Sequence, residues 1–210
     1  MSKNHETNLV ISLSIFSVFL VVARVYISQS IGLAFMVWNL FLAWLPYLFS
    51  FLIIKYRERW KQLVFSIFWL LFLPNAPYMI TDLLHLHLRS VVSIPLWFDV
   101  LLLFTFSFLG LLLFFFSVKK VHRHLEYSMQ KIKAWIIIYA VFFLTGFGIY
   151  LGRFLRWNSW DLFTRPYALF ADMSQLVLLP FHHPNTWAFT IGISGFLIIV
   201  YKAVYHTKLQ

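Results

Sequence analysis

The sequence of 210 residues predicts an all-α integral membrane protein: a bundle of about six transmembrane helices forming one polytopic domain over residues 1–210. Hydrophobic residues make up 61% of the chain and charged residues only 11%, which is too little charge to cover a soluble domain of this length. Six apolar runs approach the roughly 20 residues that a helix needs to cross a bilayer. Lysine and arginine gather in a few short segments between those runs, as in multi-pass proteins.

The first predicted span covers 9–27 and the second 33–54. The first follows Lys3 and is long for the core of a signal peptide, and no small-x-small cleavage site comes after it, so we interpret it as a membrane helix. The second contains Pro46, which a membrane helix tolerates because neighbouring helices can pair with the freed backbone groups.

The third span, 62–81, is broken by Pro74 and Pro77. Proline removes a backbone donor and disfavours helical geometry in the residue before it, so we expect a helix to end near Leu73 and Asn75 to cap a new one. The fifth span carries Gly148 and Gly152, a pair spaced for close helix packing. Between the last two spans, 166–180 suits a short helix with Pro166 at its start. The remaining spans are predicted at 97–118, 134–152 and 187–205.

The distribution of basic residues predicts the orientation. If both termini and the segments 55–61 and 119–133 are cytoplasmic, they hold 12 of the 17 lysine and arginine residues. All four aspartates then lie at extracytoplasmic ends of the spans. We therefore expect a multi-pass protein with both termini in the cytoplasm and a polar outer face.

One polar cluster is predicted in "PNAPYMITDLLHLHLR", after the broken third span. On a helix, Asp82, His85 and Arg89 share one side at spacings of three and four residues. Broken membrane helices often border binding sites, and we count Asn75 with this cluster. The alternative is a hydrated helix end with an incidental row of polar side chains.

A second cluster is predicted in "GRFLRWNSWD". Arg153 and Arg156 offer guanidinium groups that can grip a phosphate or carboxylate with two hydrogen bonds, and Asn158 and Asp161 add polar groups. Flanking tryptophans also fit a simple interfacial anchor, so that alternative stays open.

Asp99 opens the fourth span, where an acid usually pairs with a cation, and its candidate partners are Arg89, Arg153 and Arg156. A divalent metal held by Asp82, Asp99, His85 and His182 is an alternative that no recognised ligand spacing supports, so we predict neither a metal nor a cofactor. With no cysteine in the chain, disulfides, thiolate metal sites and a cysteine nucleophile are excluded.

Three of these blocks, "FLPNAPYMITDLLHL", "WFDVLLLFTFSFLGLLL" and "GFGIYLGRFLRWNSWDLF", resemble an uncharacterised bacterial family of membrane proteins, domain of unknown function number 1361. The resemblance implies a multi-pass protein of the bacterial cytoplasmic membrane. It supplies no catalytic residues.

Three functions remain open from the sequence. The first is a protein of the cell envelope that binds an anionic lipid or an envelope precursor. It is favoured because it requires the fewest special roles for individual residues. The second is a transferase or hydrolase acting on a lipid-linked substrate, with Asp82 or Asp161 as the base and His85 as a proton shuttle. The third is a small transporter, for which deep polar residues are few. We expect the lipid bilayer as a partner and no nucleic acid, because the net charge of +10 is not gathered in a soluble basic module. The sequence does not indicate an oligomeric state.

Overall fold

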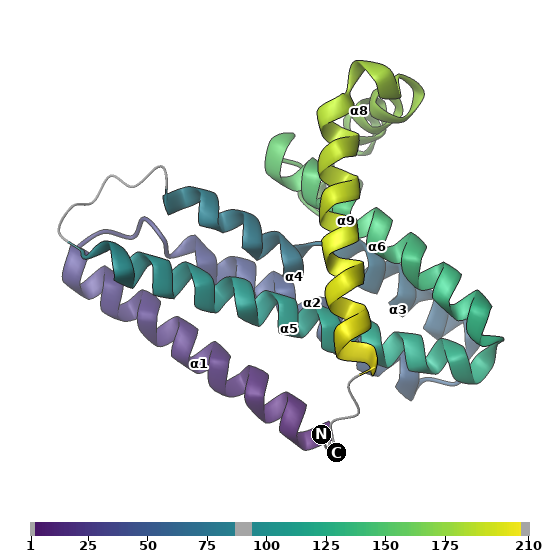
Figure 1. The fold of residues 1–210 in the computed structure, drawn as a ribbon, viewed down its shortest axis with the longest axis horizontal. Coiled ribbons are helices and arrows are strands. Elements are labelled where there is room, and N and C mark those ends of the chain that lie inside the picture. The colour runs from purple at the N-terminus through teal and green to yellow at the C-terminus, as the bar shows by residue number, and fades with distance from the viewer. Residues whose placement is uncertain (1–2, 87–93, 207–210) are drawn as a thin grey trace. The chain divides into compact units, whose positions relative to one another are not determined.

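A computed structural model of the chain describes residues 3–86 and 94–206, with side chains from residue 5 to residue 205 within those ranges. Every element in these ranges is a helix, and six are long and apolar enough to cross a membrane, which confirms the predicted fold class (Figure 1). The elements are α1 (Lys3–Ser28), α2 (Phe35–Lys55), α3 (Arg59–Phe72), α4 (Asn75–Tyr78), the 3-10 helix η1 (Met79–Leu86), α5 (Leu96–Ser128), α6 (Lys131–Phe154), α7 (Asp161–Thr164), α8 (Pro166–Leu178), the 3-10 helix η2 (Pro180–His182) and α9 (Pro184–His206).

The chain divides into two compact units, of which the first ends at Val121 and the second covers His122–Thr207. In the first unit, α2 packs against α1, α3 and α4. In the second, α6 packs against α9, and α8 packs against its short neighbours α7 and η2. Helix α5 contributes to both units, because it continues from residue 96 to residue 128.

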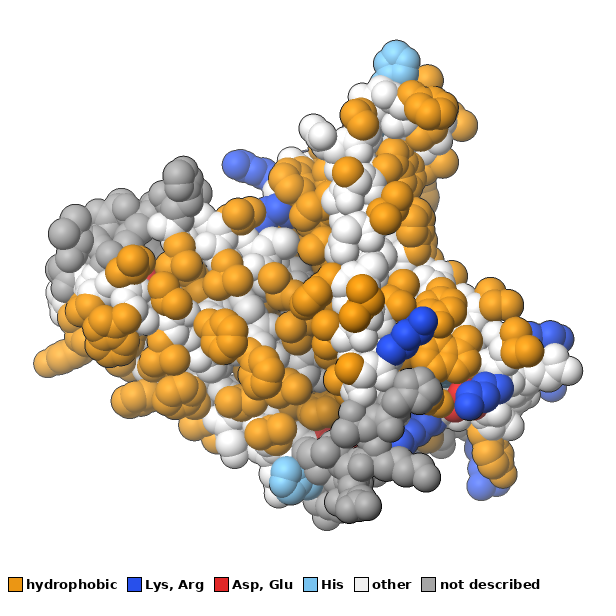
Figure 2. Space-filling model, in the orientation of Figure 1, with side chains coloured by type: hydrophobic (Ala, Val, Ile, Leu, Met, Phe, Trp, Pro, Cys, Tyr) orange, Lys and Arg blue, Asp and Glu red, His pale blue; other side chains and the backbone are white. Residues whose placement is uncertain are grey.

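Apolar side chains cover the outside of the membrane-length helices as well as their contacts. On α1, Ile15, Phe19 and Val22 form an exposed stripe at helical spacing. Hydrophobic side chains also dominate the visible face of the molecule in Figure 2. Such a surface is unfavourable in water and is the one that lipid chains solvate.

Buried hydrogen bonds join three helices of the first unit. The Trp69 indole N–H on α3 donates to the Ser117 hydroxyl at 2.7 Å, and that hydroxyl donates to the carbonyl of Pro46 at 2.9 Å. One serine of α5 thus links α3 to the proline-bearing turn of α2. The deep position of Trp69 therefore serves helix packing.

The predicted break at Pro74 is present. Helix α3 ends at Phe72, one turn of α4 follows, and the chain then continues as η1. Asn75 does not cap the new helix: it is the first residue of α4, and its amide donates back to the carbonyl of Phe72 at 2.9 Å. The prediction of an N-cap at Asn75 was wrong because the break leaves carbonyl groups of α3 without partners, and the amide can pair with one of them.

A glycine lets α5 approach the broken segment. A β-carbon at Gly110 would collide with the carbonyl oxygen of Ala76 and crowd the sulfur of Met79. One turn earlier on α5, the Ser107 hydroxyl donates to the carbonyl of Met79 at 2.9 Å. Helix α5 therefore covers the irregular backbone and pairs with one of its carbonyls, as required of a broken helix in lipid.

The second unit is built on a close contact between α6 and α9. At Gly146 a β-carbon would collide with the Ser194 hydroxyl and approach the carbonyl of Thr190 at 2.7 Å. The Ser194 hydroxyl donates across the contact to the carbonyl of Phe142 at 3.1 Å. The small residue at this contact is thus Gly146, whereas Gly148, which the sequence indicated, is half-buried.

We predict that Gly110→Ala lowers the thermal unfolding midpoint of the detergent-purified protein. Overpacking of this kind costs about 1–3 kcal/mol, or roughly 2–10 °C for a chain of this size. Gly195→Ala is the control, because its β-carbon would meet nothing within 4 Å and alanine favours a helix. Equal midpoints for Gly110→Ala and wild type would contradict the close approach of α5.

Candidate functional site

The candidate residues fall in both units, and each cluster is described by itself. Asn75, Asp82, His85 and Asp99 belong to the first unit, whereas Arg153, Arg156, Asn158 and Asp161 belong to the second. Arg89 lies outside the described residues.

Asp82 is buried in η1 and already engaged. The Asn39 side-chain amide on α2 donates to its Oδ2 at 3.0 Å. His85 Nδ1 lies 3.7 Å from Asp82 Oδ1 and 3.1 Å from the Asp82 carbonyl, and the imidazole packs on Phe35 at 5.0 Å. Asp82 and His85 do meet, as the sequence predicted, but on a 3-10 helix with a spacing of three. Asn39 is a partner that sequence reasoning missed.

Asp99 forms a buried ion pair with Arg24. Arg24 Nε donates to Asp99 Oδ1 at 2.8 Å, and both side chains are at most 5% exposed. Arg24 was not among the predicted partners, which were Arg89, Arg153 and Arg156. Its signal in the sequence is its place inside an apolar run, where an unpaired charge is very unfavourable. The pair joins α1 to α5, which is a structural role.

The end of α6 sets the geometry of the second cluster. The helix stops at Phe154, and Arg156 adopts a left-handed backbone conformation with φ of 59°. This turn allows the Trp157 backbone N–H to donate to the carbonyl of Leu151 at 3.1 Å, which pairs one of the last carbonyls of the helix. Glycine usually occupies such a position, because a β-carbon is strained there. In this protein the position is occupied by the exposed Arg156.

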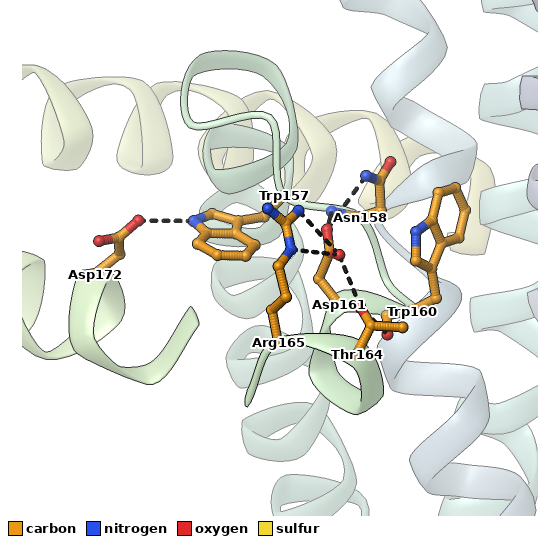
Figure 3. A network of polar contacts seen from close by, with 7 residues as sticks. All are labelled: Trp157, Asn158, Trp160, Asp161, Thr164, Arg165 and Asp172. Atoms are coloured by element: carbon orange, nitrogen blue, oxygen red, sulfur yellow. Dashed lines mark hydrogen bonds and ion pairs between the residues drawn. The ribbon is translucent and has the colours of Figure 1, made fainter. Parts of the chain in front are cut away.

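Asp161 accepts hydrogen bonds from three residues (Figure 3). Its Oδ2 accepts from the Asn158 backbone N–H at 2.8 Å and from the Asn158 amide at 3.2 Å. Its Oδ1 accepts from the Thr164 hydroxyl and from Arg165 Nη2, each at 3.1 Å. The backbone hydrogen bond from Asn158 is the main reason that the pKa of Asp161 lies below its ordinary value, and the bonds from Arg165 and Thr164 add to it.

Arg165 and Trp157 extend this network, as Figure 3 shows. The Arg165 guanidinium lies over the Trp157 ring at 4.9 Å, and the Trp157 indole N–H donates to Asp172 Oδ2 at 2.9 Å. Sequence reasoning did not include Arg165, although its spacing of four residues from Asp161 is the signal for an ion pair at the start of a helix.

Around the network lies a surface of arginines and exposed aromatic rings, which we call the Arg/aromatic segment, residues 153–181. Arg156 is exposed, and the Arg165 side chain is 60% exposed. Guanidinium groups beside aromatic rings match the chemistry of a membrane interface, where phosphates and hydrocarbon meet. The exposed rings are Phe154, Trp160, Phe163, Tyr167, Phe170 and Phe181.

The hydrogen bonds to Asp161 bear on its acid–base chemistry. A carboxylate with a lowered pKa and its acceptor sites filled, like Asp161, is a weak general base near neutral pH. His182 lies in the other unit from Asp82, Asp99 and His85. Within residues 3–86 and 94–206, no group of three or more His, Asp or Glu side chains is placed to hold a metal ion.

We predict that acid loosens the segment around Asp161. Because its folded pKa is lowered, the stabilisation by its carboxylate is complete above about pH 4 and is lost as the pH falls through the folded value. Hydrogen exchange of residues 157–165, corrected for intrinsic rates, should therefore quicken between pH 4 and pH 2. Asp161→Asn should remove this dependence and Asp172→Asn should keep it. A wild-type segment indifferent to acid would refute the role of Asp161.

Comparison with known proteins identifies a family for this chain and no function. Searches of curated proteins and of solved structures find no match. A family model described as "Protein of unknown function (DUF1361)" matches residues 38–200, which include the broken third span, the Asp99 helix and the Arg/aromatic segment. The chain therefore belongs to this family of proteins of unknown function, DUF1361.

Proposed function

We propose that the protein binds a phosphate-bearing envelope molecule, an anionic lipid or a lipid-linked precursor, at the Arg/aromatic segment of its second unit. The observation that carries this proposal is Arg156. Its guanidinium is exposed, and no hydrogen bond or ion pair engages that side chain within the described ranges. The neighbouring carboxylates of Asp161 and Asp172 already accept hydrogen bonds from other residues. An anion that approaches the segment therefore meets an available guanidinium group.

The backbone at Arg156 supports the proposal. A residue with a β-carbon costs roughly 1–2 kcal/mol in the left-handed region, where glycine costs almost nothing. The turn at residue 156 thus accepts a strained arginine where glycine would stabilise the fold. Strain at an exposed functional group is typical of binding sites.

We further propose that both termini are cytoplasmic and that the segment faces the outside of a bacterial cytoplasmic membrane. The segments 55–61 and 119–133 carry nine of the 17 lysine and arginine residues, the pattern of cytoplasmic segments. The second segment includes the end of α5, where Lys119 is buried. Lys208 lies outside the described residues, and its contribution rests on the sequence alone.

The two other functions have weaker support. An enzyme would need a base, and the carboxylates of Asp161 and Asp82 are both held by hydrogen bonds. A transporter would need a polar site near the midplane of the membrane. The Thr105, Ser107 and Thr145 hydroxyls near the middle of the spans donate to backbone carbonyls.

We predict that Arg156→Gly separates binding from stability. The variant removes the guanidinium and relaxes the backbone, so its unfolding midpoint should equal or exceed that of wild type. Binding should fall by roughly 10- to 150-fold, since a hydrogen bond to a charged group contributes about 1.5–3 kcal/mol. Retention of phosphatidylglycerol and of a polyprenyl phosphate, measured by native mass spectrometry against phosphatidylcholine, tests this and distinguishes the two sources of phosphate.

Gln29→Gly is the matched control for Arg156→Gly, because Gln29 also has a left-handed backbone, with φ of 51°, at the end of α1. It should keep full binding, and its gain in stability should be smaller, because the variant also loses the hydrogen bond from the Gln29 amide to the Tyr26 carbonyl at 2.6 Å. Unchanged phosphate retention in Arg156→Gly, or an equal loss in both variants, would refute the site.

The proposed orientation predicts how two serine-to-cysteine variants of this cysteine-free chain react with an impermeant thiol reagent. Ser128 and Ser174 are both exposed, and each donates its hydroxyl to a backbone carbonyl of the preceding helical turn. In intact cells an impermeant thiol reagent should label Ser174→Cys and should label Ser128→Cys only after lysis. The reverse pattern would overturn the orientation and place the Arg/aromatic segment in the cytoplasm.

A further inference from the structure

The end of α8 and the turn after it expose a run of apolar side chains, residues 177–181, which we call the apolar tip. Leu178 is 75% exposed and Phe181 is 95% exposed, and Val177 and Leu179 are exposed as well. The tip is the last part of the Arg/aromatic segment. A contiguous exposed apolar surface of this kind marks a place where a protein or a membrane binds.

The sequence around the tip carries no charged side chain. Between Asp172 and Lys202 there is no lysine, arginine, aspartate or glutamate. Helix α9 begins only at Pro184, so the uncharged stretch starts before the membrane-length helix and includes the whole tip. A turn in water would normally carry charged side chains. Polarity therefore changes along the Arg/aromatic segment, which is basic before α8 and apolar after it.

Packing within the second unit places the end of α8 beside α6, short of the end of that helix. Leu176 belongs to a buried cluster with Phe147 and Leu151 of α6, and Trp187 near the start of α9 packs against this cluster (Figure 1). Phe147 lies seven residues before the last residue of α6, Phe154, which is roughly 10 Å along the helix axis. The end of α8 thus reaches the level of the membrane-spanning part of α6.

The backbone of the turn is suited to an apolar environment. The Leu179 N–H donates to the carbonyl of Gln175 at 3.0 Å, the His182 N–H to Leu179 at 3.0 Å, and the His183 N–H to Pro180 at 3.2 Å. Pro180 has no N–H to pair. Irregular backbone is very unfavourable in lipid unless its polar groups are paired within the protein, and these hydrogen bonds pair much of this turn.

We propose that the apolar tip inserts into the hydrocarbon of the membrane that α6 and α9 cross, in the leaflet where α6 ends. Its occupant is lipid acyl chains, because the tip leads directly into α9 and lies at a depth that a soluble partner does not reach. Helix α8 is then inclined, with Arg165 before its start among the lipid headgroups and its last turn about 5–10 Å deeper. The inference concerns the apolar end of the segment and does not rest on phosphate binding at Arg156.

The experiment measures the depth of a nitroxide spin label in this cysteine-free chain, reconstituted in phosphatidylcholine nanodiscs. Leu178→Cys and Phe181→Cys carry the label at the tip. Tyr167→Cys is the matched control, because Tyr167 is 92% exposed at the start of the same helix. Oxygen concentrates in hydrocarbon and a neutral nickel complex in water, so the ratio of their collision rates with the label reports depth.

The collision ratio at positions 178 and 181 should be several-fold higher than at position 167. Two further variants calibrate the scale: Phe19→Cys, on the exposed stripe in the middle of α1, reports hydrocarbon, and Ser128→Cys, at the exposed end of α5, reports water. Ratios at 178 and 181 equal to that at 128 would place the tip in water and overturn the proposal. Low access to both reagents would show that protein covers the tip, for example a second copy of the chain, and would also overturn it.

A charge at the tip supplies a test that needs no label. Phe181→Asp should lower the thermal unfolding midpoint in phosphatidylcholine nanodiscs by roughly 2–4 °C, because the carboxylate has to leave the lipid. An acid just before a helix is otherwise favourable, and Phe181 is too exposed for its loss to open a cavity. Tyr167→Asp is the control that should not lower the midpoint. An unchanged midpoint in Phe181→Asp would contradict insertion.

Discussion

Hydrocarbon offers no water to a buried N–H, hydroxyl or charge, so each polar group within the spans of this chain has to find its partner in the protein. The first unit shows what that constraint determines. Asp99 takes Arg24 across α1 and α5, Asp82 takes the amide of Asn39 on α2, and Ser117 bridges Trp69 and the carbonyl of Pro46. Because each of these pairs joins different helices, pairing fixes which helices are neighbours and at what height. Dispersion contacts among similar apolar side chains would specify this far less precisely.

The proline break shows the same constraint acting on the backbone. Pro74 interrupts the α3 ladder, and the freed groups are not left facing lipid: Asn75 pairs with Phe72, and Ser107 pairs with Met79. Gly110 permits the approach of α5 that brings Ser107 into place. A break that would be very unfavourable in a lone helix is therefore sustained by one glycine and two polar side chains from its surroundings.

This constraint also explains how far the sequence could be read. Six spans, the break at Pro74 and the short helix beginning at Pro166 follow from local patterns of hydropathy and proline, and the structure has them. Interaction partners were harder to predict. The sequence offers several arginines as partners of Asp99, and the pairing with Arg24 depends on how α1 packs against α5. Asp82 and His85 meet through a 3-10 turn, which a pattern drawn for an α-helix does not distinguish. The segment 119–133 could be explained by topology, so the contacts of His122 with Tyr201 and of Glu126 with Tyr205 were not predicted. Their signal was the pair of spacings of four residues, His122 with Glu126 and Tyr201 with Tyr205.

Charge pairing shows which acidic side chains of this protein are already engaged with another residue. All seven acidic side chains lie in the described ranges, and each has a partner there: Glu6 with Lys120, Glu58 with Lys61, Asp82 with Asn39, Asp99 with Arg24, Glu126 with Tyr205, Asp161 with Asn158 and Asp172 with Trp157. The chain carries a net charge of +10, so basic residues outnumber these carboxylates, and some of the basic side chains are exposed, as at Arg156. The carboxylate oxygen that departs from this pattern is Glu126 Oε1, which has no hydrogen-bond partner within the described ranges and lies 3.7 Å from Nε2 of the buried His122 imidazole.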